Sequence, residues 1–211
     1  MAKRGRFITF EGGEGTGKST QARRLRDALE AKRITAIVTR EPGGSPGAEE
    51  IRAMLVRGDP ARWDPVTEAL LFYAARCDHT ERTIKPALNE GKWVICDRYS
   101  DSSYAYQGAG RGLARETVRR IEAIAIDDFK PDLTFILDLP SEVGLARAGQ
   151  RGNYETRFEE FDGAFHARMR KAFLDIARRA PDRCVVIDAS KDVDDVSATI
   201  LAALKARLRL R

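Results

Sequence analysis

The 211-residue sequence contains few of the side chains that form disulfide frameworks or metal centres. Its three cysteines, Cys77, Cys96 and Cys184, lie far apart and never form a C-x-x-C pair. This spacing argues against both a disulfide framework and a zinc site, so we expect three buried thiols. The two histidines, His79 and His166, stand alone without a metal-ligand partner at a useful spacing, and we assign neither a catalytic role.

Long hydrophobic runs and a strong charge excess are also missing. No segment approaches the ~18 apolar residues of a membrane span, and the apolar run behind the basic residues 1–6 is too short for a signal peptide. We therefore expect a cytoplasmic protein without a membrane partner. The 37 basic and 32 acidic residues give a net charge of +5 that is spread along the chain. Such a mild excess suits small polyanionic ligands better than nucleic acid, so no nucleic-acid partner is predicted.

The sequence also lacks linkers and internal repeats. With 43% hydrophobic residues, the chain can bury a full core, and its length suits one domain. Strand-like segments are predicted at residues 7–10, 34–39, 93–96, 133–139 and 184–188. Helices are predicted at residues 21–32, 47–57, 64–90, 115–129, 141–148, 156–179 and 193–208. This alternation predicts a three-layer α/β sandwich, a five-stranded parallel sheet with helices on both faces.

A glycine-rich stretch stands out at residues 12–19, GGEGTGKS, with the pattern G-x-x-x-x-G-K-[ST]. In a loop of this kind, backbone N–H groups bind phosphates, Lys18 reaches the terminal phosphates and the Ser19 hydroxyl holds Mg²⁺. A strand before it and a helix after it would place an anion at a helix N-terminus. The expected phosphate contacts come from one continuous stretch: Gly12, Gly13, Glu14, Gly15, Thr16, Gly17, Lys18, Ser19 and Thr20.

Candidates for a second ligand follow the next strands. Arg40 and Glu41 lie at the end of the second strand, where loops of an open α/β sheet line the ligand crevice. Phe72 and Arg76 are four residues apart and share a helix face, and a stacking ring beside a guanidinium suits a planar base with a carbonyl edge. Phe72 as ordinary core and Arg76 in a surface ion pair remain the alternative at this point.

The third strand ends at Asp97 and Arg98. The carboxylate can hold Mg²⁺ or its waters, and the arginine can clamp a phosphoryl group. The polar stretch at residues 100–112 directly after them is predicted to be a binding loop.

A small lid is predicted at about residues 141–160. A glycine-flanked piece there has Arg147, Arg151 and Arg157 nearby, which would bring positive charge over the phosphates. The aromatic stripe of residues 156–179, which includes Phe158, is interpreted as core packing rather than as a cofactor site.

A phosphate-binding loop by itself fits GTPases, ATPases, small-molecule kinases and nucleotide switches. The sequence has no N-K-x-D stretch for reading guanine, and a motor ATPase would need a larger chain. The acceptor candidates, the lid and the Asp-Arg pair instead favour phosphoryl transfer between two nucleotides.

Five segments resemble the bacterial thymidylate kinases over essentially the whole chain. They are FEGGEGTGKST at residues 10–20, TREPGG at 39–44, LLFYAAR at 70–76, DRYSDSSYAYQG at 97–108 and the arginine-bearing lid. The resemblance implies ATP as phosphoryl donor, dTMP as acceptor, Mg²⁺ as cofactor and a homodimer. A kinase for another nucleoside monophosphate and a non-catalytic nucleotide-binding module remain the alternatives.

The same resemblance implies individual roles. Phe72 would stack on thymine while Arg76 bonds its carbonyl edge, and Tyr106 would press against the deoxyribose. The implied acceptor contacts are Glu14, Arg40, Glu41, Arg52, Phe72, Arg76, Arg98, Ser102, Ser103, Tyr106 and Gln107. The implied catalytic residues are Lys18, Asp97, Arg98, Arg147, Arg151 and Arg157, with Ser19 and Asp97 organising Mg²⁺.

Two positions bear on which cation acts in catalysis. Family members with arginine after the loop's acidic residue supply the catalytic cation there, whereas this chain has Gly15 and resembles the type that uses lid arginines. Gly149 stands where another basic lid residue is expected. Which lid arginine dominates therefore stays open.

Overall fold

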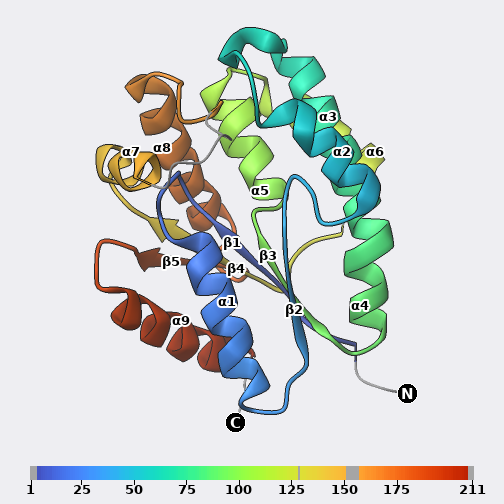
Figure 1. Cartoon of the computed structure of the whole chain (residues 1–211), viewed down its shortest axis with the longest axis vertical. Coiled ribbons are helices and arrows are strands. Elements are labelled where there is room, and N and C mark those ends of the chain that lie inside the picture. The colour runs from blue at the N-terminus through green and yellow to red at the C-terminus, as the bar shows by residue number, and fades with distance from the viewer. Residues whose placement is uncertain (1–3, 128, 151–156, 209–211) are drawn as a thin grey trace.

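The computed structural model describes residues 4–127, 129–150 and 157–208. Within these residues, all strand pairs are parallel and one sheet forms in the order β2-β3-β1-β4-β5 (Figure 1). The strands are β1 (Phe7–Glu11), β2 (Ala36–Arg40), β3 (Trp93–Asp97), β4 (Leu133–Asp138) and β5 (Cys184–Asp188). The predicted five-stranded parallel sheet is confirmed.

Helices cover both faces of this sheet. Those described are α1 (Lys18–Glu30), α2 (Pro46–Leu55), α3 (Pro65–His79), α4 (Lys85–Asn89), α5 (Ser100–Ser103), α6 (Arg115–Ile126), α7 (Ser141–Gly149), α8 (Gly163–Arg179) and α9 (Val193–Leu208). A 3₁₀ turn, η1, spans Pro60–Arg62, and π-helical segments form η2 (Thr80–Ile84) and η3 (Tyr104–Gly110). Helices α1 and α9 pack on one face, while α4 and α8 pack on the other.

Alternation along β1 shows how the layers are built. Ile8 and Phe10 belong to the core beneath α1 and α9, whereas Phe7 belongs to the core on the α4 side. All five residues of β1 are buried, because a parallel sheet covered on both faces presents no side to water. This is why residues 7–10 appear in the sequence as one continuous apolar run.

The stretch at residues 100–112 is helical over most of its length, so the prediction of a loop is wrong. Its serines and glycines have low helix propensity, but the helix start is fixed from outside by a buried carboxylate. Glu11, at the end of β1, accepts hydrogen bonds from the backbone N–H groups of Tyr99 and Ser102 and from the Ser102 hydroxyl. A long-range cap of this kind leaves no local sequence pattern.

The helix predicted at residues 156–179 starts later than expected. Helix α8 begins at Gly163, where the Asp162 carboxylate caps it by accepting from the Phe165 N–H at 2.7 Å. Residues 157–160 form a turn before it. The predicted helix over 64–90 is described as three consecutive pieces, α3, η2 and α4.

Candidate active site

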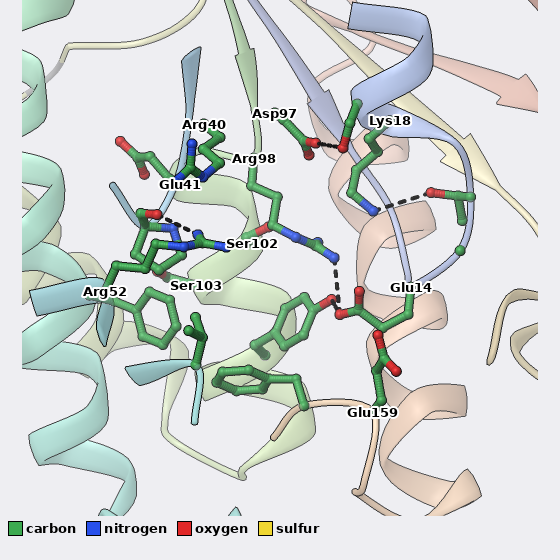
Figure 2. A pocket seen from close by; sticks show the side chains of 18 of the residues that line it. Glu14, Lys18, Arg40, Glu41, Arg52, Asp97, Arg98, Ser102, Ser103 and Glu159 are labelled. Atoms are coloured by element: carbon green, nitrogen blue, oxygen red, sulfur yellow. Dashed lines mark hydrogen bonds and ion pairs between the residues drawn. The ribbon is translucent and has the colours of Figure 1, made fainter. Parts of the chain in front are cut away.

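A cavity of about 500 Å³ opens at the carboxyl ends of β1, β2 and β3. It runs from the start of α1 to the middle of α3, and side chains from distant parts of the sequence converge on it (Figure 2). The predicted residues along it are Glu14, Gly15, Thr16, Gly17, Lys18, Ser19, Thr20, Arg40, Glu41, Arg52, Phe72, Arg76, Asp97, Arg98, Ser102, Ser103, Tyr106, Gln107 and Arg147. Gly12 and Gly13 instead line a small hollow on the α8 side of the loop.

The glycine loop, residues 12–19, connects β1 to α1 and forms the donor end of this cavity. The buried Lys18 side chain turns back over the loop, donating from Nζ to the Gly13 carbonyl at 2.6 Å and to Thr16 Oγ1 at 3.3 Å. Burial is the main cause that lowers the pKa of Lys18 to about 8, and the nearby charge of Arg98 acts in the same direction. A desolvated ammonium group at a helix N-terminus is an anion site.

Gly15 has φ +65 and lies against the first turn of α7. A Cβ atom added at Gly15 would lie 1.9 Å from the Gly144 carbonyl oxygen, and one added at Gly144 would lie 2.4 Å from the Glu14 carbonyl oxygen. The glycine loop and α7 therefore pack backbone against backbone.

Two oxygen side chains meet beside the loop. The Ser19 hydroxyl donates to the Asp97 carboxylate, because the parallel pairing of β1 with β3 brings the two strand ends together. Mg²⁺ in proteins is bound by one or two carboxylates together with phosphates and waters, and this pair fits that donor set. Among the described residues, no group of three or more His, Cys, Asp and Glu side chains could hold a metal unaided.

Arg98 lines the cavity and lies between the loop residues Lys18 and Glu14 on one side and Glu41 and Arg52 on the other (Figure 2). With φ at 71°, its backbone turns the side chain back toward the loop. Its guanidinium donates to the Gly12 carbonyl at 2.8 Å and to the Glu14 carboxylate at 3.0 Å, and it lies 4.9 Å from the centroid of the Tyr106 ring. The Tyr106 hydroxyl also donates to Glu14, at 2.6 Å.

Glu14 is consequently held as an anion between two cations. Burial acts to raise its pKa, but the charges of Arg98 and Lys18 outweigh that effect and lower the pKa to about 2. A carboxylate of this kind can accept hydrogen bonds from a ligand but cannot act as an acid near neutral pH.

Arg76 forms the far end of the cavity and is almost completely buried. It donates from Nε to Glu41 at 2.6 Å, from Nη1 to the Ser103 hydroxyl at 2.9 Å and from Nη2 to the Tyr99 carbonyl at 3.0 Å. Three of its N–H donors are engaged in these bonds, and a guanidinium has five. The alternative of a surface ion pair is excluded, since Arg76 and Glu41 are both inside the protein.

Two further arginines lie at the edge of the cavity. Arg40 pairs with Glu49 at 3.0 Å, and Arg52 donates to the Pro42 carbonyl at 2.6 Å. Both line the cavity from the β2 and α2 side.

Comparison with known proteins identifies this arrangement. The thymidylate kinase family profile matches residues 10–200. The chain belongs to the thymidylate kinase family. It is 56% identical to the thymidylate kinase of Caulobacter vibrioides over 98% of this chain and 99% of that protein, and 53% identical to that of Dinoroseobacter shibae over 97% and 98%.

The fold also agrees with a solved member of the thymidylate kinase family. The crystal structure of the enzyme from Ehrlichia chaffeensis matches with a TM-score of 0.77 at 34% identity, covering 96% of this chain and 99% of that one. The resemblance inferred from the sequence and the predicted fold class are both confirmed.

Of the three arginines predicted for a lid in this thymidylate kinase family member, the two in the described residues have different surroundings. Arg147, on α7, lines the cavity and donates to the Ala189 carbonyl at 3.2 Å. Arg157 is fully buried, does not line the cavity, and bonds to Glu68 and to backbone carbonyls of the segment from the end of α2 to η1. This geometry does not favour the predicted catalytic role for Arg157, because its guanidinium is already enclosed. Arg151 lies outside the described residues.

Sequence reasoning missed several residues along the cavity. Phe158 packs against the core on the α8 side, as predicted, but it also lines the cavity, where its ring centroid lies 5.8 Å from that of Phe72 and 5.5 Å from that of Tyr106 in edge-on geometry. Arg23 also reaches the cavity. It lies four residues after Ser19 on α1, and this helical spacing was a signal that could have found it.

Proposed function

We propose that the chain transfers the γ-phosphoryl group of ATP to dTMP, giving dTDP and ADP. The observation that carries this proposal is a single cavity with a phosphate-binding loop at one end and an aromatic ring beside a guanidinium, Phe72 and Arg76, at the other. Arg98 lines the same cavity and bonds to the loop at Gly12 and Glu14. Membership of the thymidylate kinase family supports the same reaction.

At the acceptor end, Phe72 stacks on thymine and Arg76 donates to a base carbonyl. Ser103 and Gln107 lie along the base edge, and Tyr106 contacts the deoxyribose. The ring of Tyr106 is fixed by its bond to Glu14, which supports a rigid wall that disfavours a 2′-hydroxyl. Glu14 accepts from the 3′-hydroxyl of the same sugar, in keeping with its low pKa.

At the donor end, the backbone N–H groups of the glycine loop and the Lys18 ammonium bind the phosphates of ATP. Arg98, supported by Arg40 and Arg52, holds the acceptor phosphate. The attacking oxygen belongs to that phosphate and is already ionised, so no residue has to act as a general base. The protein positions the two nucleotides and neutralises the charge on the transferred group.

Ser19 and Asp97 are the residues that would hold Mg²⁺. When bound with ATP, this ion supplies charge neutralisation at the phosphate oxygens.

The chain acts as a single domain in which residues 141–160 serve as a small lid. Arg147 is the described lid arginine that lines the cavity. We assign it, together with Arg151, the role of supplying positive charge to the transferred group.

The active form is a homodimer that works in the cytoplasm. Exposed apolar side chains support an interface on two packed helices: Val66 and Leu70 lie one turn apart on α3, and Ile124 on the adjoining α6 is 89% exposed. Family membership is the basis for the cytoplasmic assignment. In the described part of the chain, no helix combines the length and the apolarity that crossing a bilayer requires.

The test is an assay of ADP release with a panel of acceptors: dTMP, dUMP, dCMP, dGMP and dAMP. The proposal expects dTMP to give the highest kcat/KM and Lys18→Met, which keeps the aliphatic stem without the charge, to lose at least about 10²-fold in kcat. ADP release that is independent of every acceptor would overturn it. A higher kcat/KM for another monophosphate would keep the reaction class and change the substrate.

A further inference from the structure

A buried polar cluster lies directly behind the base end of the cavity. Its centre is Glu68, in the first turn of α3, which is 0% exposed. One carboxylate oxygen accepts from the Gln107 side-chain nitrogen at 2.9 Å, and the other accepts from Arg157 at 2.5 Å. Of these three residues, Gln107 alone lines the cavity. The other two therefore act on a ligand only through it.

Arg157 holds the Glu68 carboxylate in place. Three of its other four N–H donors bond to backbone carbonyls, those of Leu55 and Asp59 at 3.1 Å and that of Pro60 at 2.9 Å. These carbonyls end α2 and begin η1, so the guanidinium ties the segment before α3 to the carboxylate on α3. A buried carboxylate that is paired and hydrogen-bonded in this way has one fixed geometry.

The carboxylate decides which way round the Gln107 amide faces. An amide side chain donates through nitrogen and accepts through oxygen, whereas a carboxylate only accepts. Glu68 therefore binds the NH₂ end of Gln107 and leaves the carbonyl oxygen as the atom that can accept from a ligand. A neutral partner at position 68 could bind either end.

With this orientation, Gln107 and Arg76 together recognise the order of hydrogen-bond acceptor and donor along the edge of a base. Arg76 offers N–H donors, and Gln107 offers an acceptor on the neighbouring helical segment. Thymine presents a carbonyl oxygen next to a ring N–H, which matches donor and acceptor in that order. Cytosine presents an amino group next to a bare ring nitrogen, so both contacts would be mismatched.

We propose that Glu68 is a positioning residue that fixes the polarity of the Gln107 amide and thereby makes the site select thymine over cytosine. The inference rests on the proposed function, in which Gln107 lies along the base. Glu68 touches no substrate. Its effect appears in the KM for the acceptor and in the ratio of kcat/KM for dTMP to that for dCMP.

The test is Glu68→Gln, which keeps the shape of the side chain and removes the requirement for a donor partner. The dTMP to dCMP ratio should fall at least about tenfold, because unpaired polar groups are the main means of rejecting such analogues. The KM for ATP should stay within about twofold. Because this change leaves the Arg157 charge unpaired, the double variant Glu68→Gln/Arg157→Met provides a neutral cluster with the same expected ratio.

The matched control is Asp132→Asn, which breaks a carboxylate pair with Arg6 at the amino ends of β1 and β4, opposite the end of the sheet where the cavity lies. It should lower thermal stability without changing the ratio. Gln107→Leu should lower the ratio by itself, and adding Glu68→Gln to it should change the ratio by less than about twofold, since the carboxylate then has nothing to orient.

The outcomes separate the two proposals. A lower ratio in Gln107→Leu with an unchanged ratio in both Glu68→Gln variants overturns the role of Glu68 and leaves the function intact. An unchanged ratio in Gln107→Leu also overturns the role of Glu68, because Gln107, which Glu68 orients, then does not contribute to base selection. Failure of the unmutated protein to phosphorylate dTMP overturns the proposed function itself.

Discussion

Lys18 is a buried cation whose charge depends on pH near the physiological range. Its pKa of about 8 belongs to the protein without a nucleotide, in which burial disfavours the ammonium form. Bound phosphates favour that form, so above pH 8 ATP binding must be accompanied by proton uptake. We expect the Kd for ATP to rise by up to about tenfold per pH unit above pH 8.

Calorimetric titrations with ATP at pH 7 and pH 9, in buffers of different ionisation enthalpy, measure this uptake. Lys18→Met is the control and should bind ATP weakly without proton uptake. Uptake that survives in Lys18→Met would assign the proton to another group. Glu11, whose pKa is also about 8, is the first candidate.

At the scale of single residues, the sequence allowed us to predict those site residues that belong to a recognisable motif. Lys18, Asp97 and Arg98 lie where their motifs placed them. Glu68 and Phe158 were missed because their neighbours in space are about 40 to 90 residues away along the chain. Nothing in local spacing shows that a glutamate in the first turn of a helix will meet a glutamine and an arginine inside the protein.

At the scale of elements, Glu11 links β1 to α5 and should make stability depend on pH. Burial is the main cause that raises its pKa to about 8, and the charge of Asp101 adds to the effect. Because the folded-state pKa lies above the unfolded value, the contribution of Glu11 to stability is full at low pH and is lost as pH rises toward 8.

The variant Glu11→Gln removes this titration. Between pH 5 and pH 8, the free energy of unfolding of the unmutated protein should fall relative to that of the variant, by at most about 1.4 kcal/mol per pH unit. Chemical denaturation at several pH values measures the difference. A difference that stays constant across this range would show that Glu11 does not titrate there.

Arg147 and Arg157, both predicted for a lid, should differ in the property that their substitution lowers: the reaction rate for Arg147 and the stability for Arg157. Arg147→Gln should lower the single-turnover rate by up to about 10³-fold with little change in Tm, since Arg147 faces the cavity. Arg157→Gln should lower stability by about 3 to 5 kcal/mol, because it leaves the buried Glu68 carboxylate unpaired. Single-turnover kinetics and thermal unfolding of both variants measure the two effects. A large loss of rate in Arg157→Gln with a large loss of stability in Arg147→Gln would exchange the roles of the two residues.

The type of an element could be predicted where the side-chain periodicity is strong. The prediction failed where contacts with residues far away in the sequence determine the local structure. The strands and α9 were predicted closely, because apolar runs and helical spacing are local signals. Residues 100–112 were predicted as a loop from their serines and glycines, yet Glu11 stabilises a helix start there. Helix α8 starts at a capping aspartate that lies inside an apparently continuous amphipathic pattern.

At the scale of the whole molecule, the proposed homodimer depends on apolar surface over α3 and α6. Leu70→Glu and Ile124→Glu should each place a charge in that interface and shift the protein to monomers. Sedimentation velocity measures this shift. Val186→Glu, on the edge strand β5, is the matched control, since Val186 is a comparably exposed apolar residue at the far edge of the sheet. Dissociation by Val186→Glu alone would move the interface to β5.

The class of the fold followed from the alternation of strands and helices, but the strand order did not. Strands buried on both faces look alike in sequence, so β1 could not be placed at the centre between β3 and β4 from its composition. That central position decides which loops surround the nucleotides. It brings the ends of β1 and β3 together and with them Ser19 and Asp97.

Because Gly15 and Gly144 are in contact, an arginine in the loop at position 15 and α7 in its present place exclude each other. An arginine at position 15 would need the volume that the main chain of α7 already occupies. Grafting a loop-borne cation onto this chain would therefore require moving α7 outward as well. Because position 15 has no side chain, α7 packs directly on the nucleotide-binding loop, and a substitution at this position would have to be matched by a change in α7.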